Sequence, residues 1–147
     1  MILIPDANSI ISALIKRGKA FELFEWNDLR KEIRFVAPEY LSSEIRENIS
    51  SLINRSKLSE DEILEALNKI ESQIEFVPFS KFKQFIPRAL EISPPNDFPY
   101  IALALYLKKE GSEARILSND KQLLESLSKV GIDGLALHEL LKEIKLV

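Results

Sequence analysis

Three aspartates lie at points in the chain where a carboxylate can do chemistry. Asp6 directly follows an apolar N-terminal run, Asp120 closely follows a second such run, and Asp97 precedes a stretch rich in alanine and leucine. Carboxylate oxygens are the ligands that hard divalent cations prefer. Aspartate is also a preferred helix N-cap, and for each aspartate taken alone capping is the simpler interpretation. A capping carboxylate remains available to a metal ion, so both interpretations stay open.

Glu44 differs from the neighbouring glutamates in its position on a predicted helix. A helix over residues 38–53 has one apolar stripe, and Glu44 lies just beyond the edge of that stripe. Glu39 and Glu47 point further away and are ordinary solvated residues. A solvated helix face also explains Glu44, and only its border position makes it a candidate for a site.

The composition excludes several kinds of chemistry. The chain has no cysteine and one histidine, His138, which excludes disulfides, thiolate catalysis, zinc ribbons and iron–sulfur clusters. A single histidine cannot form a pair of catalytic imidazoles. The net charge of -3 gives no overall attraction to nucleic acid, so an RNA partner requires bridging metal ions or a local basic patch. The absence of cysteine, of an export signal and of a long apolar run indicates a cytoplasmic protein with no membrane span.

Predicted strands alternate with predicted helices along the whole chain. The strands cover residues 1–5, 33–37, 74–77, 115–117 and 134–137, and the helices cover 8–16, 20–29, 38–53, 59–70, 79–92, 97–109, 119–130 and 138–145. This order favours a single α/β domain over residues 1–147, a doubly wound parallel sheet of about five strands with helices on both faces. Ligands of such sheets bind beyond the carboxyl ends of the strands, which is where Asp6 and Asp120 fall.

In order and spacing, four acidic positions resemble those of the PIN-domain ribonucleases. They are Asp6 in LIPDAN, Glu44 in PEYLSSEI, Asp97 in PPNDFPYIALAL and Asp120 in ILSNDKQLL. The resemblance covers essentially the whole chain. It implies a PIN-like fold in which these four residues bind one or two Mg²⁺ or Mn²⁺ ions. It also implies that Asn8 and Ser118 support the four acids by hydrogen bonds.

The same resemblance implies a ribonuclease that hydrolyses RNA phosphodiester bonds with a metal-activated water. Clustered carboxylates stay ionised together when a cation offsets their repulsion, and that cation can lower the pKa of a water molecule. Small stand-alone members of the family are often the toxin of a VapC-like toxin–antitoxin pair. The expected partners are therefore an RNA substrate, a small antitoxin protein and a second copy of the chain in a homodimer.

Two positions depart from the family pattern. Many members have an acid two residues after the position of Asp120, where this chain has Gln122, and another three residues before Asp97, where it has Pro94. These departures leave open the occupancy of a second metal site and the rate of the reaction. Asn96 offers an amide oxygen as a weaker ligand.

Two other functions fit the residues. A PIN-fold module that binds RNA or a protein with weak or no turnover fits Gln122, Pro94 and the acidic balance. A phosphohydrolase of the HAD type requires an Asp-x-Asp pair after the first strand, but Asn8 occupies the place of the second aspartate.

The aromatic residues also allow two interpretations. Phe79, Phe82 and Phe85 are spaced at i, i+3 and i+6, which is more typical of core packing than of a base-stacking surface. The aromatic residues in the predicted helix 20–29 belong either to the core or to a dimer contact.

Overall fold

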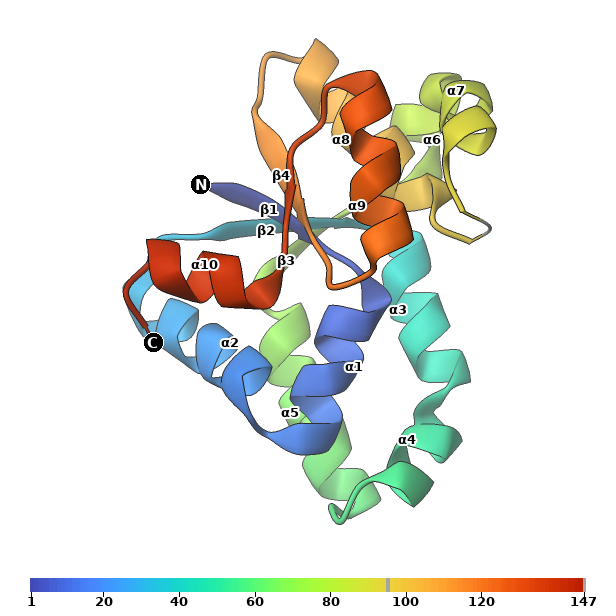
Figure 1. The fold of residues 1–147 in the computed structure, drawn as a ribbon. Coiled ribbons are helices and arrows are strands. Elements are labelled where there is room, and N and C mark those ends of the chain that lie inside the picture. Colours follow the sequence, from blue (N-terminus) through green and yellow to red (C-terminus); the bar gives the residue numbers. More distant parts are fainter. Residues whose placement is uncertain (95, 147) are drawn as a thin grey trace.

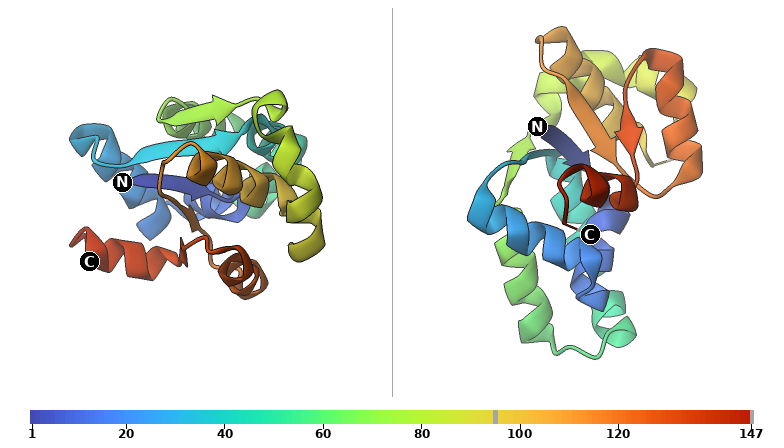
Figure 2. Two further views of the ribbon diagram at one scale, coloured as in Figure 1. Left: turned by 90° about the horizontal axis from the view of Figure 1, so that it is seen from above. Right: turned by 60° about the vertical axis from the view of Figure 1, so that its left-hand side comes forward.

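The fold is built around one parallel sheet, and a computed structural model describes residues 1–94 and 96–146. The five strands of this sheet are β1 (Ile2–Pro5), β2 (Arg34–Pro38), β3 (Ile74–Val77), β4 (Ala114–Leu117) and β5 (Gly134–Leu135). Their order is β3-β2-β1-β4-β5, and every neighbouring pair is parallel (Figure 2, left). The predicted doubly wound α/β sheet is confirmed, with β1 at its centre.

Helices cover both faces of the sheet. They are α1 (Ala7–Lys16), α2 (Lys19–Arg30), α3 (Glu39–Glu47), α4 (Ile49–Arg55), α5 (Glu60–Glu71), α6 (Phe79–Phe82), α7 (Ile86–Ile92), α8 (Phe98–Lys109), α9 (Lys121–Leu127) and α10 (Leu137–Glu143). Figure 1 shows α8 with α6 and α7 on one face, and α1, α2 and α5 on the other. Within the described residues, no helix is both long and apolar enough to cross a membrane.

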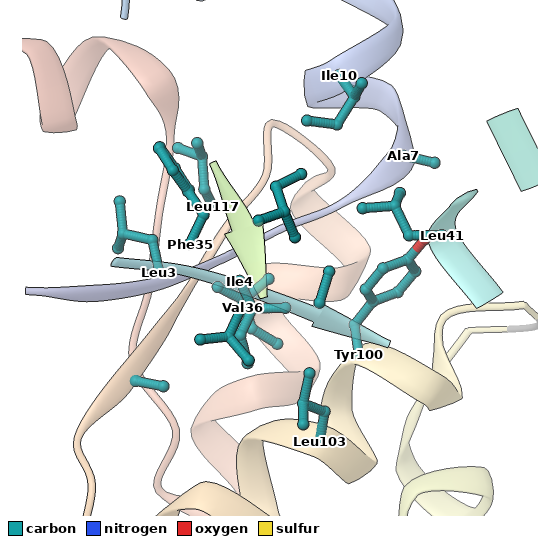
Figure 3. Packing of buried hydrophobic residues seen from close by; sticks show 14 of the residues in the cluster. Leu3, Ile4, Ala7, Ile10, Phe35, Val36, Leu41, Tyr100, Leu103 and Leu117 are labelled. Atoms are coloured by element: carbon teal, nitrogen blue, oxygen red, sulfur yellow. The ribbon is translucent and has the colours of Figure 1, made fainter. Parts of the chain in front are cut away.

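Burial on both faces explains why β1 and most residues of β2 and β4 are apolar. Leu3 and Ile4 are successive residues of β1, so their side chains point to opposite faces, and both are fully buried. The helix α8 is buried almost all round, as its sequence predicts. Its Tyr100 points from beneath the sheet edge toward Leu41 of α3 (Figure 3), which ties α8 to the segment that follows β2.

The predicted helix over residues 38–53 is wrong in one respect, because it breaks at Asn48 into α3 and α4. The side-chain Nδ2 of Asn48 donates to the backbone oxygen of Glu44 at 2.7 Å, and its backbone N–H donates to Ile45 instead. In a continuous helix, the backbone N–H of Asn48 would donate to this oxygen of Glu44. A side chain that binds the same oxygen competes with the helical hydrogen bond. The break therefore follows from the local chemistry of one asparagine.

The predicted helix over residues 79–92, which Pro87 is expected to disturb, divides before that proline, into α6, a short 3-10 turn at Lys83–Phe85, and α7. Pro87 occupies the second position of α7, where a missing N–H costs no helical hydrogen bond. Toward the C-terminus, β5 ends at Leu135, two residues earlier than predicted, because Ala136 already caps α10.

Candidate functional site

Asp6 lies at the carboxyl end of β1 and caps α1. Its Oδ1 accepts hydrogen bonds from the backbone N–H of Ser9 at 2.9 Å and from the Ser9 hydroxyl at 2.7 Å. The residue is only 5% exposed. Burial is the main cause that raises the pKa of Asp6, and the nearby charge of Asp120 raises it further, while the hydrogen bonds lower it. The structure thus confirms the capping interpretation of Asp6 and leaves its carboxylate at the edge of the sheet.

Ser118 links Asp6 to Asp120. Its hydroxyl is fully buried, donates to Asp6 Oδ2 at 2.5 Å and accepts from the backbone N–H of Asp120 at 3.0 Å. Asp120 in turn caps α9, because its Oδ1 accepts from the backbone N–H groups of Gln122 and Leu123. One oxygen atom therefore positions two acids that are far apart in the sequence.

Glu44 reaches the same region from α3. It is half-buried, and its Oε1 accepts a hydrogen bond of 2.9 Å from the hydroxyl of Tyr100. Burial raises the pKa of Glu44, and the charges of Asp6 and Glu47 add to this, against the lowering effect of the Tyr100 bond. The border position expected for Glu44 on its helix agrees with this partial burial.

Asp97 is the acid whose carboxylate forms no hydrogen bond with the described residues. It precedes α8 as the N-cap residue, but its side chain accepts no capping hydrogen bond, so the capping interpretation is wrong here. Burial, followed by the charges of Asp120, Asp6 and Glu44, raises the pKa of Asp97 to about 6. Its carboxylate thus lies within electrostatic reach of the other three acids.

Asp6, Glu44, Asp97 and Asp120 together are called the acidic cluster below. They come from four separate segments, which meet because the carboxyl ends of β1, β2 and β4 share one edge of the sheet. In the described part of the chain, none of the four forms a salt bridge with a lysine, an arginine or the histidine. Within the described residues, only neutral hydrogen-bond donors such as Ser118 and Tyr100, and no basic side chain, offset the mutual repulsion of these carboxylates.

The donor chemistry of the acidic cluster fits a hard divalent cation, since it consists of carboxylate oxygens and carries negative charge. Among residues 1–94 and 96–146, no three side chains of His, Asp or Glu are close enough to hold one ion together. Magnesium commonly keeps several of its water molecules and uses only one or two protein carboxylates. A magnesium site of that kind does not require three acidic side chains close enough to bind the ion directly.

The two supporting residues expected from the sequence behave differently. Ser118 contacts Asp6 and Asp120, whereas Asn8 is exposed and forms no hydrogen bond with an acid of the cluster in the described structure. Ser9 takes that place beside Asp6. Asn8 instead lines a pocket of about 330 Å³ that Ser9 and Asp120 also line. The hydrogen-bonding role expected of Asn8 is therefore wrong in this structure.

Sequence reasoning missed Ser9 and Tyr100. A signal for Ser9 exists, because it stands three residues after the N-cap Asp6, where side chains commonly join a capping arrangement. Tyr100 stands three residues after Asp97 and so shares its helix face, but its bond to Glu44 spans 56 residues. Asn96 is exposed with a left-handed φ of 73°, and Gln122 is also exposed.

A family model described as the PIN domain matches residues 4–142 of this sequence, almost its whole length. The chain belongs to the PIN domain family. No curated protein gives a significant match to the sequence. PIN domains are a family of nucleases, so membership supports a nuclease of the hydrolase class.

Two solved structures share the PIN fold seen here. VapBC2 from Rickettsia felis, bound to a DNA fragment from its promoter, is 16% identical with a TM-score of 0.65, over 92% of this chain and 98% of that chain. PAE2754 from Pyrobaculum aerophilum is 14% identical with a TM-score of 0.68, over 100% of this chain and 91% of that chain. At these identities the likeness concerns the fold alone.

Replacing Ser118 with alanine should reduce any nuclease activity that depends on the acidic cluster by about 10–100-fold, which is the usual effect of losing a group that orients metal-ligating carboxylates. The change removes the donor to Asp6 Oδ2 and the acceptor of the Asp120 N–H. It should also lower the free energy of unfolding by about 1–3 kcal/mol. Cleavage rates and thermal unfolding of the two proteins test both effects.

Ser126→Ala is a matched control for this variant. Ser126 is also buried, and its hydroxyl donates to the backbone oxygen of Leu123 at 2.7 Å, with no bond to the acidic cluster. This control should lose stability without a comparable loss of activity. Equal losses of activity in the two variants would contradict a positioning role for Ser118.

Proposed function

We propose that this chain is a divalent-metal-dependent endoribonuclease that hydrolyses RNA phosphodiester bonds. The observation that carries the proposal is the acidic cluster, in which burial and neighbouring acids raise the pKa of Asp6, Glu44 and Asp97, and whose four carboxylates have no basic partner in the described residues. A pair of divalent ions, or one ion, relieves that repulsion and gives the acidic protein a local positive charge for a phosphodiester.

The residues of the cluster have distinct roles in this proposal. Asp6, Glu44, Asp97 and Asp120 hold Mg²⁺ or Mn²⁺, which supplies an activated water and stabilises charge on the phosphate when bound. Ser9 and Ser118 fix both oxygens of Asp6, and Ser118 also fixes the backbone of Asp120. Tyr100 orients Glu44 through its hydroxyl. A pre-oriented set of oxygens reduces the rearrangement needed to bind an ion.

The test is cleavage of RNA with Mg²⁺ or Mn²⁺, with and without EDTA. We expect cleavage that requires the metal and stops with EDTA. Cleavage that continues unchanged in EDTA would contradict the metal dependence. Metal binding measured by calorimetry without any RNA cleavage would favour the alternative in which the chain binds RNA or a protein with little turnover.

We further propose that the chain is the toxin of a toxin–antitoxin pair. The support is the fold shared with VapBC2 of Rickettsia felis, whose structure is that of a toxin–antitoxin complex. Expression in a bacterial host should arrest growth, and co-expression of a small protein encoded beside this gene should relieve the arrest. Such an antitoxin is expected to bring arginine or lysine to the acidic cluster, because opposite charges attract across an interface.

The homodimer remains a prediction from the family resemblance. Of the aromatic residues in α2, Phe24 is buried, and Phe21 and Trp26 are half-buried and pack against the core. Core burial thus accounts for them without a dimer contact. Sedimentation velocity of the purified chain measures the oligomeric state directly.

A further inference from the structure

Exposed aromatic side chains are concentrated at one place in the molecule. The sequence has eight phenylalanines, three tyrosines and one tryptophan, and the structure describes all of them. Only Tyr40 and Phe79 are exposed, at 40% and 58%. They are called the aromatic pair below. Scattered exposed apolar residues need no explanation, but two aromatic rings on one edge of a sheet do.

The aromatic pair lies at the carboxyl ends of two neighbouring strands. Tyr40 is the second residue after β2, and Phe79 is the second residue after β3. The last residues of these strands, Pro38 and Val77, are register partners in the parallel ladder. Adjacent strands lie about 4.8 Å apart. The two rings therefore start from neighbouring points on the same edge that carries the acidic cluster.

A buried ring supports each member of the pair. Tyr40 meets Tyr100 edge-to-face with 6.4 Å between ring centroids, and Phe79 meets Phe82 in the same way at 5.9 Å. Tyr100 and Phe82 are almost completely buried. Because Tyr100 also donates to Glu44, the support of Tyr40 is continuous with the acidic cluster. The core-packing interpretation is therefore correct for Phe82 but wrong for Phe79.

Positive charge follows Phe79 along the chain, whereas the charges near Tyr40 are those of acids, Glu44 and Asp97 of the acidic cluster among them. Lys81 and Lys83 follow Phe79 closely, are exposed, and form no salt bridge with an acid of the described residues. Aromatic rings beside unpaired lysines are the combination that binds unpaired bases and their phosphates in single-stranded nucleic acid. An acidic cluster repels a phosphate backbone, so a substrate needs such attraction nearby.

We propose that Tyr40 and Phe79 form a stacking platform for unpaired bases of an RNA strand whose phosphodiester lies at the acidic cluster. The proposal deepens the proposed ribonuclease function and rests on it. Both residues act in substrate binding, with no part in the hydrolytic step. The platform selects single-stranded segments, because bases paired in a duplex do not expose their faces to side chains.

Binding without hydrolysis tests the platform directly. In EDTA, fluorescence anisotropy measures the affinity of the protein for a labelled adenosine RNA decamer and for an abasic decamer with the same phosphates. The wild-type protein should bind the adenosine decamer more tightly. Tyr40→Leu and Phe79→Leu should each weaken that binding about tenfold and leave the abasic decamer unaffected. Leu29→Ala, which alters an exposed residue of α2, should change neither affinity.

Several outcomes would overturn the platform. They are equal affinity of the wild-type protein for the two decamers, no binding of either, or an equal loss of both affinities in the variants. The first of these would leave the aromatic pair as a contact for a protein. In Mg²⁺, the variants should raise KM about tenfold with kcat within about twofold. Cleavage with unchanged KM refutes the platform alone, whereas base-dependent binding without cleavage refutes the ribonuclease alone.

Discussion

Replacing Asp6 with asparagine should reduce the rate of Mg²⁺-dependent RNA cleavage at least about 100-fold. Loss of a group that merely orients a metal ligand already lowers metal affinity or activity by about 10–100-fold. Asparagine is a good N-cap, so its oxygen can keep the bonds that Ser9 makes to Asp6. The change removes the negative charge and turns one oxygen acceptor into an amide donor facing Ser118. Activity should therefore fall while the fold is retained, as measured by cleavage rates and circular dichroism.

Asp133→Asn is the matched control for this variant. Asp133 is an exposed aspartate just before β5, at the amino end of the sheet. The same change of charge there should leave cleavage within about twofold of the wild-type rate. Full activity in Asp6→Asn would refute the assignment of Asp6, and a large loss in Asp133→Asn would show that overall charge controls the rate.

The architecture could be predicted from the sequence because its strands and helices differ in pattern. A short apolar run such as residues 1–5, followed by helical spacing, is repeated along the chain, and only a parallel sheet satisfies that order. The break at Asn48 could not be predicted in this way. The break depends on whether the side chain or the backbone N–H of Asn48 donates to the oxygen of Glu44. The spacing of apolar residues is the same in both cases, so it cannot distinguish them.

The candidate site divides in a similar way. The placement of Asp6 and Asp120 at one edge follows from the sheet, because the carboxyl ends of parallel strands meet. Position alone makes Glu44 and Asp97 weak candidates, since an acid on or before a helix is usually solvated or a cap, and the family resemblance is what groups them with Asp6 and Asp120. The bond from Tyr100 to Glu44 joins α8 to α3 and depends on packing that no local pattern encodes.

The exposed rings show where local patterns mislead. Phe79 and Phe82 stand three residues apart, which favours one shared apolar face, yet only Phe82 is buried. Because α6 is just 4 residues long, its two ends belong to different environments, the sheet edge and the space beneath α8. Periodicity over a few residues cannot distinguish these environments.

Without divalent ions, the advantage in stability of an Asp97→Asn variant over the wild-type protein should grow as pH rises. Asp97 has a pKa of about 6 in the folded protein, against 3.8 for an ordinary aspartate. Between these values the folded state holds a proton that the unfolded state releases, so wild-type stability falls with rising pH. The partly exposed carboxylate is screened by water, so we expect a loss of about 1 kcal/mol, or about 3 °C in melting temperature. The Asp97→Asn variant has no carboxyl group to ionise at this position, so its stability should not fall in this way.

Magnesium should reverse this difference, which separates a metal site from a merely crowded cluster of acids. An ion at about one hundred times its Kd stabilises the folded state by about 2.7 kcal/mol, and therefore should raise the wild-type melting temperature by roughly 5–10 °C near pH 7.5. The same addition near pH 5 should have little effect, because Asp97 is then mostly protonated. Asp97→Asn should respond weakly at both pH values. An equal magnesium response of both proteins near pH 7.5 would exclude Asp97 as a ligand, since its charge would then contribute nothing to holding the ion.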